Sequence, residues 1–135
     1  MYRKSALLLI IIVLLFVVTI CKKDNPAEPP VKNTIFITVG SGTSPRYSWL
    51  DVNGKVTRIY RLTVYEKTNL GDHIWGIQTA GGEFDGISSP VTHGTIPSGA
   101  EKYGIRDVTV LPDGFTYRVM VQKMNGEQGW KDFSR

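Results

Sequence analysis

The stretch LPDGFTYRVMVQKMNGEQGWKDF, residues 111–133, decides the fold class of this chain. Within it, Tyr117, Val119 and Val121 recur at every second position, which is the side-chain period of a β-strand with one face turned to a core. We therefore expect these three side chains to point inward. The predicted strands of this stretch cover residues 115–124 and 129–133.

The rest of the chain from about residue 33 repeats this pattern, with short runs of period two between turn residues and no amphipathic helix. In one run Tyr60, Leu62 and Val64 face one side, while Arg61 and Thr63 face the other. About seven short strands at this spacing predict an all-β fold, an antiparallel β-sandwich. The further predicted strands cover residues 34–39, 46–50, 58–66, 73–79, 89–96 and 105–110.

The last third of the chain resembles the end of a fibronectin type III domain, which is an immunoglobulin-like β-sandwich. Leu111 lies six residues before Tyr117, a Y-x-V-x-V strand follows, and the Asn125-Gly126 turn leads to a final strand. The resemblance implies a tyrosine corner, in which the Tyr117 ring fills the core and its hydroxyl reaches back to the backbone. Upstream, Trp49 matches the buried tryptophan of the second strand.

One departure from that pattern is Asn53-Gly54, a strong signal for a two-residue hairpin. It falls between strands that the sandwich would place in opposite sheets. Two interpretations stay open: the strands extend into a local ribbon, or the turn is part of a loop.

The N-terminus has the layout of a targeting segment. Arg3 and Lys4 precede an apolar run of about fifteen residues, which ends at Cys21, the only cysteine. A helix that spans a bilayer needs about 20 apolar residues, so the run fits a signal peptide better than a membrane span. An uncleaved hydrophobic anchor helix, with Cys21 buried, is the alternative.

The residues before Cys21, Val18-Thr19-Ile20, resemble the lipobox of bacterial lipoproteins. The resemblance implies that Cys21 is the lipid-attachment site and the N-terminus of the processed protein. Ile20 departs from the pattern, because Gly, Ala or Ser normally precedes the cysteine. Lys22, rather than Asp, follows the cysteine, and by the same resemblance this favours the outer membrane over the inner one.

Three segments follow from these observations. Residues 1–20 are the predicted lipoprotein signal peptide, 21–32 a proline-rich tether, and 33–135 the fibronectin type III-like sandwich. Prolines in the tether prevent helix formation, and nothing in it could form a core. Both interpretations of the leader place the domain in the cell envelope, outside the cytoplasmic membrane.

Charge and motif content limit the chemistry. The net charge of +4 includes Arg3 and Lys4 of the leader, and the remaining cations alternate with acids, so we expect no nucleic-acid partner. A single cysteine excludes an internal disulfide. His73 and His93 would need acidic partners brought together in space to bind a metal, so no metal is predicted, and both histidines are expected to be exposed at strand ends. No nucleophile motif appears, so we expect no enzyme, catalytic residue or cofactor.

The aromatic residues and two long loops, 79–90 and 91–104, are the places where a ligand could bind. A row of exposed aromatics on a sandwich stacks sugar rings, although Trp130 could instead cover the edge of the core. The predicted function is a membrane-anchored, non-catalytic module that binds a protein partner in the envelope or has a structural role. The alternative is a surface carbohydrate-binding module. The candidate ligand-binding residues are Trp130, Phe84, His93 and Tyr103.

Overall fold

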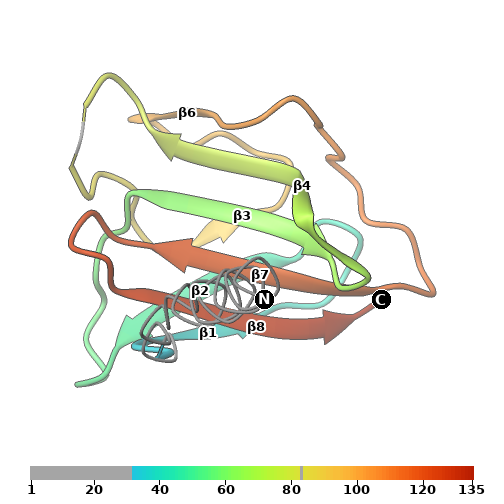
Figure 1. Cartoon of the computed structure of the whole chain (residues 1–135), viewed down its shortest axis with the longest axis horizontal. Helices are drawn as coiled ribbons and strands as arrows, with labels where there is room; N and C mark the ends of the chain where they lie inside the picture. Colours follow the sequence, from blue (N-terminus) through green and yellow to red (C-terminus); the bar gives the residue numbers. More distant parts are fainter. Residues whose placement is uncertain (1–31, 83) are drawn as a thin grey trace, which may run out of the picture. The chain divides into compact units, whose positions relative to one another are not determined.

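Two antiparallel β-sheets build the part of the chain that this computed structural model describes, residues 32–82 and 84–135 (Figure 1). The three-stranded sheet has the order β1-β2-β5, with β1 Ile35–Val39, β2 Arg46–Asp51 and β5 Val91–Thr92. The five-stranded sheet has the order β6-β4-β3-β7-β8. Its strands are β3 Arg61–Glu66, β4 Asn69–Thr79, β6 Ala100–Lys102, β7 Thr116–Gln122 and β8 Gln128–Ser134.

The predicted all-β class is confirmed, and the described residues contain no helix. Consequently no helix among them could cross a membrane. The predicted signal peptide, most of the tether and Cys21 lie outside the described residues. Residues 32–135 form a single unit with a β-sandwich-like architecture.

The two sheets enclose one core, which the period-two pattern predicted well. Tyr117, Val119 and Val121 of β7 are buried as expected. Leu62 and Val64 of β3 are buried too. The other core side chains include Ile35, Ile37, Tyr47, Trp49, Ile59, Ile74, Trp75, Ile77, Ile87, Val91 and Leu111. Tyr60 departs from the prediction, because it lies just before β3 and is only half-buried.

The tyrosine-corner contact expected of Tyr117 is present. Its hydroxyl donates a hydrogen bond to the carbonyl oxygen of Pro112, 3.0 Å away. Leu111, beside this carbonyl in sequence, is fully buried. The ring therefore fills the core while the hydroxyl satisfies a backbone acceptor.

Two strand predictions are wrong: one strand is shorter than predicted, and the other is absent. The run 89–96 shortens to β5, because Pro90 has no N–H to donate before it and Gly94, at φ 80°, turns the chain after it. The run 105–110 is not a strand. Its Val108 packs on the core and donates one hydrogen bond to the Ile74 carbonyl, whereas Val110 is exposed. Val108 is thus the one partly buried residue of a run that is otherwise exposed.

The Asn53-Gly54 turn belongs to a loop, as one of the two interpretations proposed. The Asp51 carboxylate accepts hydrogen bonds from the backbone N–H groups of Asn53, at 2.8 Å, and Lys55, at 2.9 Å. These bonds close the turn locally. The strands on either side, β2 and β3, lie in different sheets.

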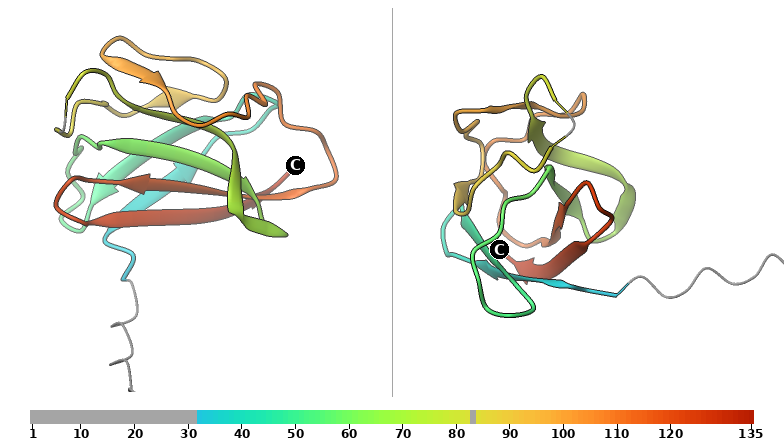
Figure 2. Two further views of the ribbon diagram at one scale, coloured as in Figure 1. Left: turned by 45° about the horizontal axis from the view of Figure 1, so that its top comes forward. Right: turned by 90° about the vertical axis from the view of Figure 1, so that its left-hand side faces the viewer.

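The two sheets meet where β1 runs beside β8 (Figure 2). The N–H of Thr34 donates to the Gln128 carbonyl at 2.8 Å, and Asn33 and Gln128 form a parallel bridge. Gly129 is buried at this crossing, and a Cβ atom there would overlap the carbonyl oxygen of Ile35. The crossing thus requires a residue without a side chain.

Candidate functional site

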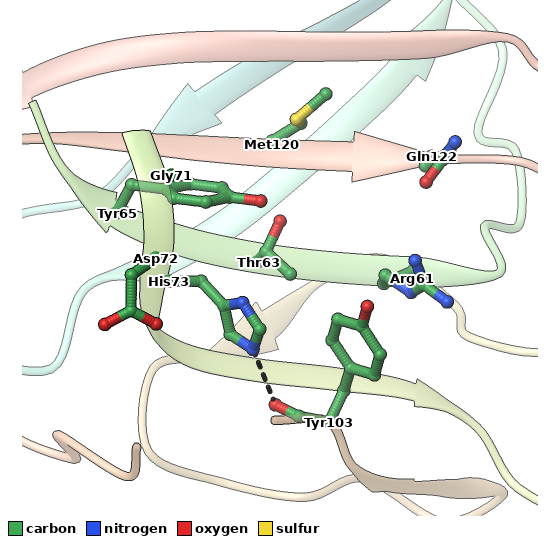
Figure 3. A pocket seen from close by; sticks show the side chains of 9 residues that line it. All are labelled: Arg61, Thr63, Tyr65, Gly71, Asp72, His73, Tyr103, Met120 and Gln122. Carbon is green, nitrogen blue, oxygen red and sulfur yellow. Dashed lines mark hydrogen bonds between the residues drawn. The ribbon is translucent and has the colours of Figure 1, made fainter. Parts of the chain in front are cut away.

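A pocket of about 390 Å³ opens on the outer face of the five-stranded sheet, away from the core (Figure 3). Its volume falls within the range of about 300–1,000 Å³ that is usual for small-molecule sites. Strands β3, β4 and β7 and the residue that follows β6 supply its walls. The lining residues are Arg61, Thr63, Tyr65, Gly71, Asp72, His73, Tyr103, Met120 and Gln122.

A β-bulge in β4 brings His73 to this face. Val64 pairs with Trp75, but the next residue of β3, Tyr65, pairs with His73, so Ile74 is the extra residue. Ile74 and Trp75 both point into the core, at 1% and 2% exposure. The bulge therefore shifts the alternation and turns His73 outward beside Tyr65.

Two glycines make room for the His73 ring. A Cβ atom on Gly104 would overlap His73 Nε2, and one on Gly76 would lie 3.2 Å from His73 Cδ2. The ring stacks on Tyr103 with centroids 4.9 Å apart and planes 6° from parallel. His73 Nε2 donates to the Tyr103 carbonyl oxygen at 3.1 Å, because a carbonyl can only accept. In the neutral ring, Nδ1 is then left as an acceptor.

Arg61 stacks on the same tyrosine. Its guanidinium carbon lies 3.9 Å from the Tyr103 ring centroid and 5.1 Å from that of Tyr60, which are cation–π distances. The Nε atom is buried without a hydrogen-bond partner. Asp72, the one carboxylate among the lining residues, pairs instead with Arg106 at 3.3 Å. The pocket therefore carries a positive charge that no described carboxylate compensates.

Another outward-facing arginine of this sheet is compensated. Arg118 donates two hydrogen bonds to Asp132, at 2.7 and 3.1 Å, and Lys67 pairs with the same carboxylate. The pKa of Asp132 is lowered to about 2, mainly by hydrogen bonding from Arg118. Arg61 differs from Arg118 in having no such partner among the described residues.

Trp130 and Tyr103 lie at opposite ends of one row across this face. The register places Trp130 opposite Met120, Met120 opposite Thr63, and Thr63 opposite Gly76. The N–H of Tyr103 donates to the Gly76 carbonyl and extends the row by one more position. Four strand spacings of about 4.8 Å separate the ends by about 19 Å. The row connects a half-buried tryptophan to the pocket.

Phe84 and His93, the other two candidate residues, do not lie in the pocket. Phe84 is 54% exposed in the loop after β4. His93 is in the core at 1% exposure, so the expectation of an exposed strand-end histidine is wrong. Its Nε2 donates to the Val108 carbonyl at 2.7 Å, and its Nδ1 accepts from the Tyr47 hydroxyl at 3.0 Å. Burial lowers the pKa of the His93 imidazole.

The two histidines face opposite sides of the five-stranded sheet. His93 packs against the inward-facing Trp75, with centroids 4.7 Å apart, whereas His73 lines the outer pocket. They cannot share a ligand. Over residues 32–82 and 84–135, no group of three or more His, Cys, Asp and Glu residues is placed to hold a metal ion.

Sequence reasoning found Tyr103 but missed Arg61, His73 and Tyr65 as members of one site. The alternation of β3 did predict that Arg61 faces away from the core, and the structure agrees. No sequence signal marked the bulge at Ile74, so no pattern could join His73 to Arg61. The loop 91–104, singled out for ligand binding, contributes Tyr103 from its end.

Neither a protein-family model, nor a curated protein, nor a solved structure significantly matches this chain.

Proposed function

We propose that this chain is an envelope-anchored lipoprotein whose sandwich domain is a non-catalytic module that binds a glycan. The outer-face row that joins Trp130 to the pocket at Tyr103 carries the proposal. An aromatic side chain at the Trp130 end and the polar side chains of the pocket at the Tyr103 end are what a sugar chain requires, because sugar rings stack on aromatic faces and their hydroxyl groups need hydrogen-bond partners.

Several observations support a fibronectin type III-like domain as the carrier. The order β1-β2-β5 in one sheet, and β3-β7-β8 within the other, follows the A-B-E and C-F-G order of immunoglobulin-like sandwiches. Trp49 is buried in β2, and Tyr117 makes its corner contact to Pro112. The bulged β4, and Tyr103 directly after the additional strand β6, supply the pocket edge.

The anchor part of the proposal comes from the sequence. An apolar run that ends at a sole cysteine, followed by a proline-rich tether, supports lipid attachment at Cys21 and a position outside the cytoplasmic membrane. The outer membrane is favoured. We expect Cys21→Ala to abolish metabolic labelling with a fatty acid and the accompanying shift in apparent mass. Unchanged labelling in that variant would contradict the lipid anchor and leave the uncleaved helix.

The glycan-binding part is tested with the full-length protein, purified in detergent, on an array of bacterial and plant oligosaccharides. We expect Tyr103→Ala to weaken binding at least about tenfold, because it removes the ring that supports Arg61 and His73. Trp130→Ala is expected to weaken binding of longer oligosaccharides while leaving short ones unaffected, since Trp130 lies about 19 Å along the row.

Phe84→Ala is the matched control, because Phe84 is an exposed aromatic that does not line the pocket. It should bind as the unchanged protein does. If no glycan on the array binds, or if Tyr103→Ala binds as well as the unchanged protein, the glycan-binding proposal is wrong.

A protein-interaction module is a second candidate, favoured by a different surface. Phe36 and Leu50 pair directly across β1 and β2 and are 57% and 40% exposed. Adjacent exposed apolar side chains are a usual feature of contact surfaces. An envelope protein that co-purifies in fixed stoichiometry, is lost with Phe36→Lys and is retained with Tyr103→Ala would favour this candidate.

A further inference from the structure

We propose that the pocket selects an acidic sugar, a ring that bears a carboxylate or a sulfate, and that Arg61 binds the acidic group. This inference deepens the proposed glycan-binding function and rests on it. It concerns which sugar enters the pocket, whereas the proposed function requires only that some sugar does.

The charge balance of the pocket is the first argument. Arg61 is half-buried, its Nε is fully buried without a hydrogen-bond partner, and no described carboxylate pairs with it. A partly buried charge without a partner is destabilising, and structures normally pair such groups. Asp72 could have served, but Arg106 holds it at the rim. An anionic ligand would supply the missing partner.

The placement of Arg61 is the second argument. Its guanidinium is held against the Tyr103 ring, which limits its rotamers before any ligand arrives. A planar guanidinium held in this way can donate two parallel hydrogen bonds to a carboxylate or sulfate. Gln122 pairs with Arg61 across β7 and β3 and adds an amide at the same end of the pocket.

The rest of the pocket fits the hydroxylated ring that would carry the acid. Figure 3 shows the hydroxyl groups of Tyr65 and Thr63 near each other at the centre of the pocket, and that of Tyr103 turned toward the Arg61 end. His73 Nδ1 remains as an acceptor, since Nε2 donates to the Tyr103 carbonyl. Donors and acceptors thus surround the space next to the cation, as hydrogen bonding to several sugar hydroxyls demands.

The test compares matched pairs of probes on the full-length protein in detergent. One pair is an oligogalacturonate and its methyl ester, which share the same sugar rings and differ in that a methyl group neutralises each carboxylate. A second pair is a sulfated galactose oligosaccharide and its desulfated form, and a panel of glucuronate, mannuronate and sialate glycans with neutral counterparts completes the set. We expect at least one acidic form to bind about tenfold or more tightly than its neutral partner.

Variants assign that preference to one residue. Arg61→Gln should erase the preference while retaining the weaker binding of the neutral forms, which also shows that the variant folds. Arg61→Lys should recover only part of the preference, because an ammonium group lacks the planar fork. Arg118→Gln removes an equal charge from the same sheet face outside the pocket, and it should leave the preference intact.

The outcomes separate the two proposals. If neutral and acidic forms bind equally, the acidic-sugar inference is wrong while glycan binding stands. If no probe of either kind binds, glycan binding itself fails and the inference fails with it. If Arg118→Gln reduces the preference as much as Arg61→Gln does, general charge attraction explains the result and the role of Arg61 is refuted.

Discussion

His93 lies in the core between Tyr47 and Trp75, where an imidazole must find hydrogen bonds on both ring nitrogens. It does so by accepting from the Tyr47 hydroxyl and donating to the Val108 carbonyl. Accepting from the Tyr47 hydroxyl requires the neutral ring, because the protonated ring has no acceptor, whereas the bond to Val108 is compatible with either form. Protonation would also place a charge in the core, so this residue links folding to pH.

We expect the free energy of unfolding to decrease as the pH falls below about 6.5. Burial lowers the pKa of folded His93 below its usual value, so the unfolded chain binds a proton at a higher pH than the folded chain does. The contribution of His93 is therefore fully present above the unfolded pKa and is lost as the pH falls toward the folded one. Urea denaturation at several pH values from about 7.5 to about 5 measures this dependence.

His93→Gln is the control variant, since an amide can make similar hydrogen bonds without titrating. It should unfold more readily at neutral pH but show a smaller loss of stability on acidification. An identical pH dependence in the two proteins would show that another group is responsible.

At the scale of the strand, two irregularities create the pocket wall and the close contact between the sheets. The bulge at Ile74 in β4 turns His73 outward and creates one wall of the pocket. The crossing of β1 over β8 at Gly129 brings the two sheets into backbone contact. Both strands depart from simple alternation at these points. The bulge turns His73 to the outer face, and Gly129 leaves its position without a side chain.

Gly129→Ala should lower the free energy of unfolding toward the upper end of the range of roughly 1–3 kcal/mol that overpacking costs. The added methyl group would overlap the Ile35 carbonyl oxygen, and backbone cannot move aside as a flexible side chain can. Chemical denaturation measures the change. Gly71→Ala is the control, because its methyl group would meet only Asn69 Oδ1 at 3.6 Å, and it should change stability by less than about 0.5 kcal/mol. Equal stability of the two variants would contradict the close crossing.

At the scale of the whole molecule, the two faces of the five-stranded sheet have different roles. The inner face packs Leu62, Val64, Val119 and Val121 into the core, and the outer face presents the pocket. Residues as far apart in sequence as Arg61 and Gln122 meet there because β3 and β7 are neighbours. The binding experiments proposed above examine this outer face as a unit.

The strand pattern predicted much of this architecture and little of the site. Alternation placed Leu62, Val64 and Val119 correctly, because each side chain's face follows from its immediate neighbours in a strand. The same rule failed over residues 105–110, where Val108 reaches the core without a strand partner. It placed Arg61 outside the core but could not show that Tyr103 would lie against it.

The sequence by itself determined the all-β class, the inward faces of β3 and β7, and the corner contact of Tyr117, because these features depend on spacing along a single segment. Only the tertiary structure decided that His93 is buried while His73 lines a pocket, and that Arg61 has no described anionic partner. A bulge and the register between distant strands produced these arrangements, and both are set by packing across the sheet rather than by local sequence.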